Sequence, residues 1–200
     1  MFIQVISGTT ADRDGLRQQF DRWEQELRPG AEGFLGSTGG VTDDGRFIAV
    51  ARFASEDAAR RNSARDEQGA WWAETEKYLD DFSFQESVDI TTMLAGGSND
   101  AGFVQVMRGR VTNALKLAEI NARTAEFEAM MSRLRPDVLG DVIAMHPDGT
   151  YTDVVYFTSE KAARDGESRE MPADAQAMFE DLMSSIVIDE YLDLKDPWLR

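Results

Sequence analysis

The sequence has no cysteine and only one histidine, and each scarcity removes a class of chemistry. Without cysteine there can be no disulfide, no thiolate nucleophile and no iron–sulfur centre. The single histidine, His146, stands just before Pro147-Asp-Gly, where a turn-flanking polar side chain is expected to be solvated. A Ser-His-Asp triad or a histidine-rich metal centre is therefore hard to build, and we predict no metal site.

Long apolar runs and positive charge are also scarce. No stretch approaches the roughly 18 consecutive apolar residues that a membrane span needs. The opening MFIQVISGTT lacks the basic and apolar regions of a secretion signal. The chain has 21 basic and 37 acidic side chains, a net charge of −16 that would repel phosphate backbones and anionic lipid headgroups. We therefore expect a cytoplasmic protein that binds neither nucleic acid nor membranes.

Two stretches of the sequence recur about a hundred residues later. FIQVISGTT at 2–10 matches FVQVMRGRV at 103–111. DDGRFIAVARFASEDAAR at 43–60 matches PDGTYTDVVYFTSEKAAR at 147–164, with nine of the eighteen positions identical. Matches that keep their order along the chain indicate a tandem duplication. We predict a first repeat at 1–94, a linker at 95–101 that contains AGGSND, and a second repeat at 102–200.

Each repeat shows the same order of predicted elements. A β-rich opening is followed by an amphipathic helix, which in the first repeat places Leu16, Phe20, Trp23 and Leu27 on one face. Two extended runs then flank Asp-Gly, a strong hairpin signal, and a serine opens a second helix before a last strand. The order β-α-β-β-α-β is the ferredoxin-like unit. We predict an α+β protein whose two antiparallel sheets pack together as a single-chain, pseudo-dimeric α+β barrel.

The two ferredoxin-like halves, the F-x-S-E-x-A-A-R entry to the second helix and the Trp-containing helix that follows resemble the dimeric α+β barrel superfamily. Within this superfamily the sequence most resembles the antibiotic-biosynthesis-monooxygenase-like group, in a tandem-fused form. The superfamily includes cofactor-independent oxygenases, haem-degrading enzymes and members without demonstrated chemistry, so the fold does not choose among them. The haem-degrading relatives carry a ligating histidine on or near the second helical segment, which neither half has, and the resemblance implies no cofactor.

The resemblance also implies a ligand site between the sheet and the two helices of one half. Asn62 matches an Asn or His of the second helix in such proteins, and Trp71 or Trp72 matches the tryptophan that follows. Tyr78 could supply a hydroxyl. We predict Asn62 and Tyr78 as catalytic residues and the two tryptophans as ligand-binding residues, with core packing as the competing interpretation of both rings.

A comparison of the repeats places this pocket in the first one. RNSARDEQGAWW at 61–72 corresponds to DGESREMPADAQ at 165–176, where the asparagine becomes Gly166 and the tryptophans become Ala175 and Gln176. We therefore expect a pocket within 1–94, supported by the second repeat. Arg108 is a further candidate for ligand binding if its strand turns it inward, and Trp198 is expected to anchor the C-terminal tail.

These observations leave three functions open. The chain could be a cofactor-independent oxygenase acting on an aromatic or polyketide-like small molecule in the first repeat, a non-enzymatic binder of small ligands, or a structural protein whose barrel has lost its pocket. Relatives with a single repeat form the two-sheet barrel by dimerisation, whereas the duplication supplies both repeats in one chain. We therefore expect a monomer, with a homodimer as the alternative.

Overall fold

The computed structural model describes residues 1–200 and contains both repeats predicted from the sequence. The elements of the first part are β1 (Phe2–Thr9), α1 (Arg13–Arg22), a π-helical turn (Trp23–Leu27), a 3-10 turn (Arg28–Gly30), β2 (Phe34–Val41), β3 (Arg46–Phe53), α2 (Glu56–Ser63), α3 (Asp66–Thr75), a 3-10 turn (Glu76–Tyr78), β4 (Asp80–Ser87) and β5 (Asp89–Leu94). The second part comprises β6 (Phe103–Val111), α4 (Ala114–Asn121), α5 (Thr124–Leu134), β7 (Val138–Met145), β8 (Thr150–Phe157), α6 (Glu160–Glu167), α7 (Ala173–Met183), β9 (Ile186–Leu194) and β10 (Trp198–Leu199).

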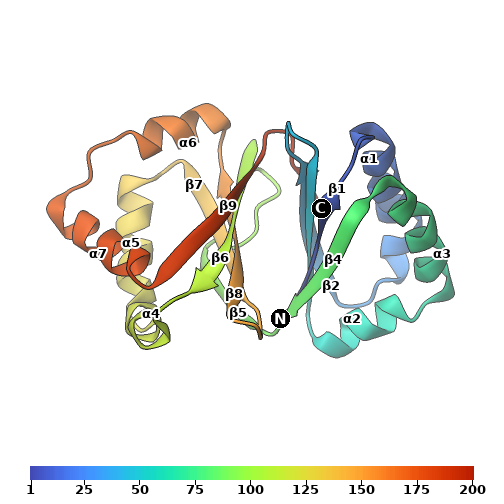
Figure 1. Ribbon diagram of the computed structural model, residues 1–200, viewed down its shortest axis with the longest axis horizontal. Helices are drawn as coiled ribbons and strands as arrows, with labels where there is room; N and C mark the ends of the chain where they lie inside the picture. Colours follow the sequence, from blue (N-terminus) through green and yellow to red (C-terminus); the bar gives the residue numbers. More distant parts are fainter. The chain divides into compact units, whose positions relative to one another are not determined.

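Each repeat forms a five-stranded sheet with its helices on one face (Figure 1). The strand orders are β10-β2-β3-β1-β4 and β5-β7-β8-β6-β9. Within each sheet the four strands of the repeat follow the ferredoxin-like order, and their pairings are antiparallel. The predicted fold class of two ferredoxin-like repeats is confirmed, whereas the packing of one sheet on the other stays a prediction. No helix combines the length and the apolar character that crossing a membrane requires.

The compact units differ from the predicted ranges at their edges. One unit contains residues 1–90 and 196–200, and the other contains residues 91–195. The difference comes from the short strands β5 and β10. Each follows one repeat in the sequence but pairs with the sheet of the other repeat. β10 adds to the free edge of β2, and β5 adds to the free edge of β7, so each covers backbone groups that would otherwise be unpaired.

Local sequence signals account for the helix starts and the hairpins. The side chains of Ser55 and Ser159 accept hydrogen bonds from the backbone N–H groups of Ala58 and Ala162, as N-caps of α2 and α6. Gly45 and Gly149, in the two predicted Asp-Gly turns, have φ angles of 84° and 83°, which glycine adopts without strain.

The expectation for His146 is wrong. Its side chain is buried, and its Nε2 atom lies 2.9 Å from the hydroxyl of Thr152 on β8. The backbone N–H of His146 also donates to the carbonyl of Thr150. The hairpin pairing thus continues past the end of β7 and holds the imidazole against the neighbouring strand instead of in solvent.

One continuous apolar cluster fills the space between sheet and helices in the first repeat. The helical face predicted from the sequence contributes Leu16, Phe20, Trp23 and Leu27. Phe47 and Ala49 contribute from β3, and Trp71 contributes from α3. The Phe20 ring meets the Trp71 ring edge-on, with 5.5 Å between centroids. This arrangement stabilises an aromatic pair in addition to the gain from burying its apolar area.

The C-terminal tail completes this cluster, as predicted for Trp198. The Trp198 ring is 2% exposed and lies 5.6 Å from the Phe20 ring and 6.1 Å from the Phe47 ring, between centroids. Backbone hydrogen bonds of 2.8 and 3.0 Å join Arg200 to Ser37, and the Arg200 guanidinium pairs with Asp21. The last five residues therefore belong to the compact unit of the first repeat, and Trp198 lies in its core.

We expect Trp198→Ala to destabilise the protein by about 3–5 kcal/mol, because removing a buried indole loses transfer free energy and leaves a void. Urea unfolding followed by circular dichroism measures this loss. Leu199→Ala, at the neighbouring half-buried position, is the control and should cost far less. Equal losses for the two variants would show that the tail does not anchor through its indole.

Candidate functional site

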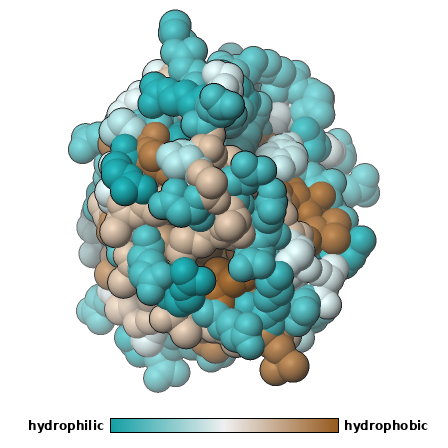
Figure 2. Space-filling view, turned by 90° about the vertical axis from the view of Figure 1, so that its left-hand side faces the viewer, coloured by the Kyte–Doolittle hydropathy of each residue, from teal (hydrophilic) through white to brown (hydrophobic).

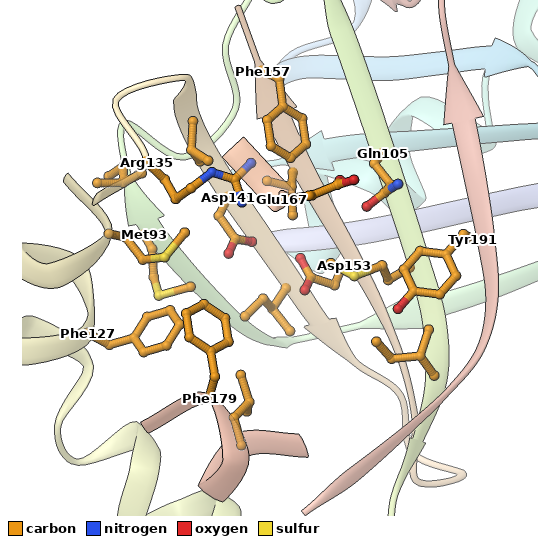
Figure 3. Close-up of a pocket in the computed structure, with 18 of the residues that line it drawn as sticks. Met93, Gln105, Phe127, Arg135, Asp141, Asp153, Phe157, Glu167, Phe179 and Tyr191 are labelled. Atoms are coloured by element: carbon orange, nitrogen blue, oxygen red, sulfur yellow. The ribbon is translucent and has the colours of Figure 1, made fainter. Parts of the chain in front are cut away.

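A cavity of about 630 Å³ lies between sheet and helices in the second repeat. The apolar side chains there form two separate clusters, one against the sheet around Phe103, Val155 and Phe157 and one between helices around Phe127 and Phe179. Members of both clusters line the cavity, together with several methionines and ten polar residues. Figure 3 shows the Phe127 and Phe179 rings on the helical side and carboxylates on the sheet side.

Two differences in side-chain size between the repeats accompany this open space. Trp71 of the first repeat corresponds to Ala175 in the second, so α7 lacks the indole that α3 contributes. Leu94 precedes Trp198 by 104 residues, the shift that relates the hairpins of the repeats, and the strands β5 and β10 occupy equivalent edges beside β7 and β2. Leucine and alanine thus stand where the first repeat places two indoles.

The cavity lies in the repeat opposite to the one predicted. The smaller residues at 175 and 176 predict that the pocket lies in the first repeat, where the tryptophans stand. In the structure the bulky residues fill the first repeat and their loss opens the second. An aromatic side chain is more stable in a close-packed core than at the wall of a cavity, because in the core it makes dispersion contacts on all sides and removes more apolar surface from water.

Two aspartates project from the sheet into this cavity (Figure 3). Asp141 lies on β7 opposite Val155 of β8, and Asp153 lies on β8 opposite Ile143 of β7. The two are diagonal neighbours on the same face of an antiparallel pair, close enough for their side chains to share a hydrogen bond. Tyr151 stands two residues before Asp153 on the same face and also lines the cavity.

The three side chains have buried polar atoms without a protein partner. One oxygen of each aspartate (Oδ1) and the hydroxyl of Tyr151 are shielded from solvent and make no hydrogen bond. Such groups cost free energy in an apolar interior, so a native fold keeps few of them, often at functional sites. A ligand with suitable polar atoms would satisfy them.

Burial also changes how these groups ionise. Burial and the nearby Asp153 carboxylate raise the pKa of Asp141 well above its usual value. Burial raises the pKa of Asp153 to about 6, opposed by the hydrogen bond with Asp141. Burial likewise raises the pKa of the Tyr151 hydroxyl. Because burial raises the pKa of both carboxyls and they share a hydrogen bond, the pair holds a proton at a pH where exposed aspartates are ionised.

Other polar residues around the cavity belong to a network that both repeats share. Gln105 donates to Asp193 at 2.9 Å, and Arg164 pairs with the same carboxylate. In the first repeat Gln4 donates to Glu86 at 3.1 Å, and Arg60 pairs with that carboxylate in turn. In both repeats the arginine also lies over a phenylalanine ring of the first strand. The network recurs in the repeat without the cavity, so it supports the fold.

The second arginine at the cavity is also neutralised. Arg135 makes two parallel hydrogen bonds to the buried carboxylate of Asp137, of 3.1 and 2.8 Å, and lies over the Phe157 ring. Glu128 accepts a hydrogen bond from the backbone N–H of Leu94. Among the charged groups at the cavity, Asp141 and Asp153 are distinguished by having each other as partner in place of a cation.

The predicted site residues of the first repeat do not line this cavity. Asn62 is buried on α2, where its side-chain oxygen accepts a 3.0 Å hydrogen bond from Arg65. Trp71 is a core residue whose Nε1 donates to the carbonyl of Gln19 at 2.8 Å. Tyr78 packs against the same core. The structure therefore brings Trp71 and Tyr78 to one apolar cluster.

Trp72 and Arg108 also lie outside the cavity lining. The Trp72 ring lies 6.0 Å from the Trp71 ring between centroids, at the edge of the core, and also packs on the half-exposed rings of Phe82 and Phe84 of β4. Arg108 follows Met107, which lines the cavity, so it lies on the other face of β6 and pairs with Glu190 at 3.0 Å. Ligand binding by these residues stays a prediction.

The sequence contains a signal for the two aspartates in the positions to which they align. Asp153 aligns with Ala49, and Asp141 aligns with Ser37, both within strands that are otherwise apolar or small. A charged residue at an inward position of a buried strand is costly, so it marks a functional site more strongly than an aromatic residue does. No group of three or more His, Cys, Asp or Glu side chains gathers as a metal site would need.

Comparisons with known proteins agree with this fold. No protein-family model and no curated protein matches the sequence. A candidate monooxygenase from Lactobacillus acidophilus NCFM has a similar structure over 100% of this chain and 98% of its own, with a TM-score of 0.70 and 10% identity. Another from Fusobacterium nucleatum covers 96% of this chain and 89% of its own, with a TM-score of 0.71 and 10% identity. An anthrone oxidase-like protein covers 99% of this chain and 92% of its own, with a TM-score of 0.66 and 9% identity.

The chain therefore shares its ferredoxin-like fold with these candidate monooxygenases and with the anthrone oxidase-like protein. The resemblance inferred from the repeats is confirmed at the level of the fold. Identities near a tenth carry no residue-by-residue assignment of activity to this chain.

We expect Asp153→Asn to stabilise the protein more at pH 8 than at pH 5. A carboxyl whose pKa is raised in the folded state lowers the free energy of unfolding as it ionises. This loss develops as pH rises from the pKa of the unfolded chain, near 3.9, through the folded value of about 6. Removing that charge should therefore raise the free energy of unfolding at pH 8 by on the order of 2 kcal/mol.

Urea unfolding at both pH values measures this difference. Asp189→Asn is the matched control, because Asp189 is an exposed residue of β9 paired with Arg110. A gain that is the same at pH 5 and pH 8 would contradict the raised pKa of Asp153.

Proposed function

We propose that this protein binds an apolar, ring-containing small molecule in the cavity of the second repeat and oxygenates it without a cofactor. The observation that carries the proposal is the cavity of about 630 Å³, a volume within the usual range for small-molecule sites. Its lining combines apolar walls with a few converging polar groups, as such sites do.

The shape of the site supports a flat, apolar ligand. The Phe127 and Phe179 rings meet at 5.4 Å and a methionine, Met131, lines the cavity beside them. Aromatic and methionine side chains make favourable contacts with ring systems and adapt to their outlines. Figure 2, which views the molecule from the side of the second repeat, shows apolar atoms at the bottom of a hollow bordered by hydrophilic side chains.

The proposed reaction needs no external reductant. A ring methylene activated by a carbonyl supplies all four electrons that dioxygen takes up, so that CH₂ and O₂ give C=O and water. The fold of candidate monooxygenases and of an anthrone oxidase-like protein supports this class of chemistry. Binding without reaction is the competing function, and the unpaired polar atoms at the cavity would serve it equally.

We expect the protein to bind anthraquinone and to consume oxygen with anthrone, and Leu94→Trp to abolish both. The substitution places in the cavity the indole that Trp198 provides in the first repeat. All four tryptophans lie in the unit that lacks this cavity, so their fluorescence would not report binding there. Calorimetry is therefore the suitable binding measurement. An oxygen electrode measures turnover above the rate in buffer.

Leu115→Trp is the matched control, since Leu115 is 82% exposed on α4 and does not line the cavity. Binding without oxygen uptake by the unsubstituted protein would favour a binder over an oxygenase. Binding that survives Leu94→Trp would place the ligand elsewhere.

A further inference from the structure

We propose that Asp153 is a general base that removes a proton from carbon, and that protonated Asp141 and Tyr151 hold the resulting oxyanion. The substrate class is then a carbon acid whose anion is delocalised onto a carbonyl oxygen. This inference rests on binding in the proposed cavity and does not depend on a reaction with oxygen.

The geometry gathers one base and two donors on a single face of the sheet. Asp141 and Asp153 are diagonal neighbours across β7 and β8, and Tyr151 lies on the same face of β8. Each has a polar atom that is buried without a protein partner. A carbonyl compound in the cavity would therefore meet acceptor and donor atoms that no protein group occupies.

The first repeat shows what the fold requires at these places. Its equivalents of Asp153, Asp141 and Tyr151 are Ala49, Ser37 and Phe47, of which Ala49 and Phe47 belong to the apolar core. None of the three polar groups is thus needed to build the sheet or to cover it with helices. Their presence in the repeat with the cavity points to a role toward a ligand.

The proton-transfer step balances within the site. The C–H bond next to the carbonyl breaks, the proton goes to the Asp153 carboxylate, and the electron pair of the bond moves to the carbonyl oxygen. The hydroxyls of Tyr151 and protonated Asp141 donate hydrogen bonds to that oxygen. Once Asp153 carries the proton, it no longer draws the hydrogen bond of Asp141, which is then free for the oxyanion.

The burial of Asp153 and the pairing of the nearby arginines keep its carboxylate basic and without a cation partner. Burial raises the pKa of Asp153 to about 6, which leaves it ionised at neutral pH yet more basic than an exposed carboxylate. The titratable groups that line the cavity around it are Tyr151 on β8, Tyr191 and Asp193 on β9, Glu128 on α5, Arg135 after α5, and Arg164 and Glu167 on α6. The arginines among them are paired with Asp137, Asp193 and Glu167, so no free cation holds Asp153 in a resting ion pair.

Hydrogen–deuterium exchange of anthrone under nitrogen tests the step separately from oxygenation. Proton NMR in D₂O would follow loss of the ring-methylene signal. We expect the protein to accelerate exchange over buffer, with a rate that rises as pH increases through about 6 and then levels. Asp153→Asn should lower the enzymatic rate about 100-fold or more, and Tyr151→Phe about tenfold.

Two measurements separate catalysis from a structural effect. Anthraquinone, which has no acidic C–H bond, should bind Asp153→Asn as it binds the unsubstituted protein. Asp153→Ala, which places there the residue found in the first repeat, should regain exchange when formate is added. Asp189→Asn is the control for loss of a carboxylate on the same sheet.

The outcomes for the two proposals are distinct. The absence of exchange with the unsubstituted protein, or undiminished exchange in either Asp153 variant, overturns the assignment of Asp153 as the base. Exchange under nitrogen without oxygen uptake in air supports that assignment and overturns the proposed oxygenation. Exchange that is lost in Asp153→Ala and restored by formate supports Asp153 as the base.

Discussion

The space between sheet and helices has equivalent backbone walls in the two repeats, and it has to be filled by side chains or by something else. In the first repeat three tryptophans and their aromatic neighbours fill it, and one of them comes from the C-terminal tail. In the second repeat Ala175 and Leu94 occupy two of those positions and a cavity of about 630 Å³ remains. A close-packed interior gives stability, whereas an open one gives up contacts and keeps room for a ligand.

The same division of roles applies to charge. Both repeats join an arginine, a carboxylate and a glutamine in one hydrogen-bonded network, in which the ions neutralise each other. The second repeat alone adds two aspartates that have only each other, and burial raises the pKa of both. Buried carboxylates without a cation weaken a fold, so their place at the cavity is best explained by chemistry there.

The difference between Asn62 and Gly166 also has a structural cause. Asn62 bonds to Arg65, which in turn donates to the carbonyl of Leu27 at the end of the first helix. At Gly166 an added Cβ would lie 2.4 Å from the Nε atom of Arg135, so a larger residue there would displace the Arg135 guanidinium. Each repeat uses an arginine from a different segment near its second helix, and the residue at this position adapts to it.

Much of the architecture follows from the sequence because its signals are local and occur twice. The helical face of Leu16, Phe20, Trp23 and Leu27, the serine caps and the Asp-Gly turns each depend on a few neighbouring residues. Because these signals occur twice in the same order, they predict the same order of elements in both repeats.

Which repeat stays open was decided by tertiary structure alone. Trp198 lies more than a hundred residues from β2 in the sequence, and only folding brings its ring between Phe20 and Phe47. The side-chain volumes that meet in one interior come from distant segments, so a local pattern cannot show whether they fill it. The amino-acid sequence by itself determined two ferredoxin-like repeats and placed Asp141 and Asp153 on inward strand positions. The packing of distant aromatic rings around Trp71, and its absence in the second repeat, decided that a cavity would open in front of those aspartates.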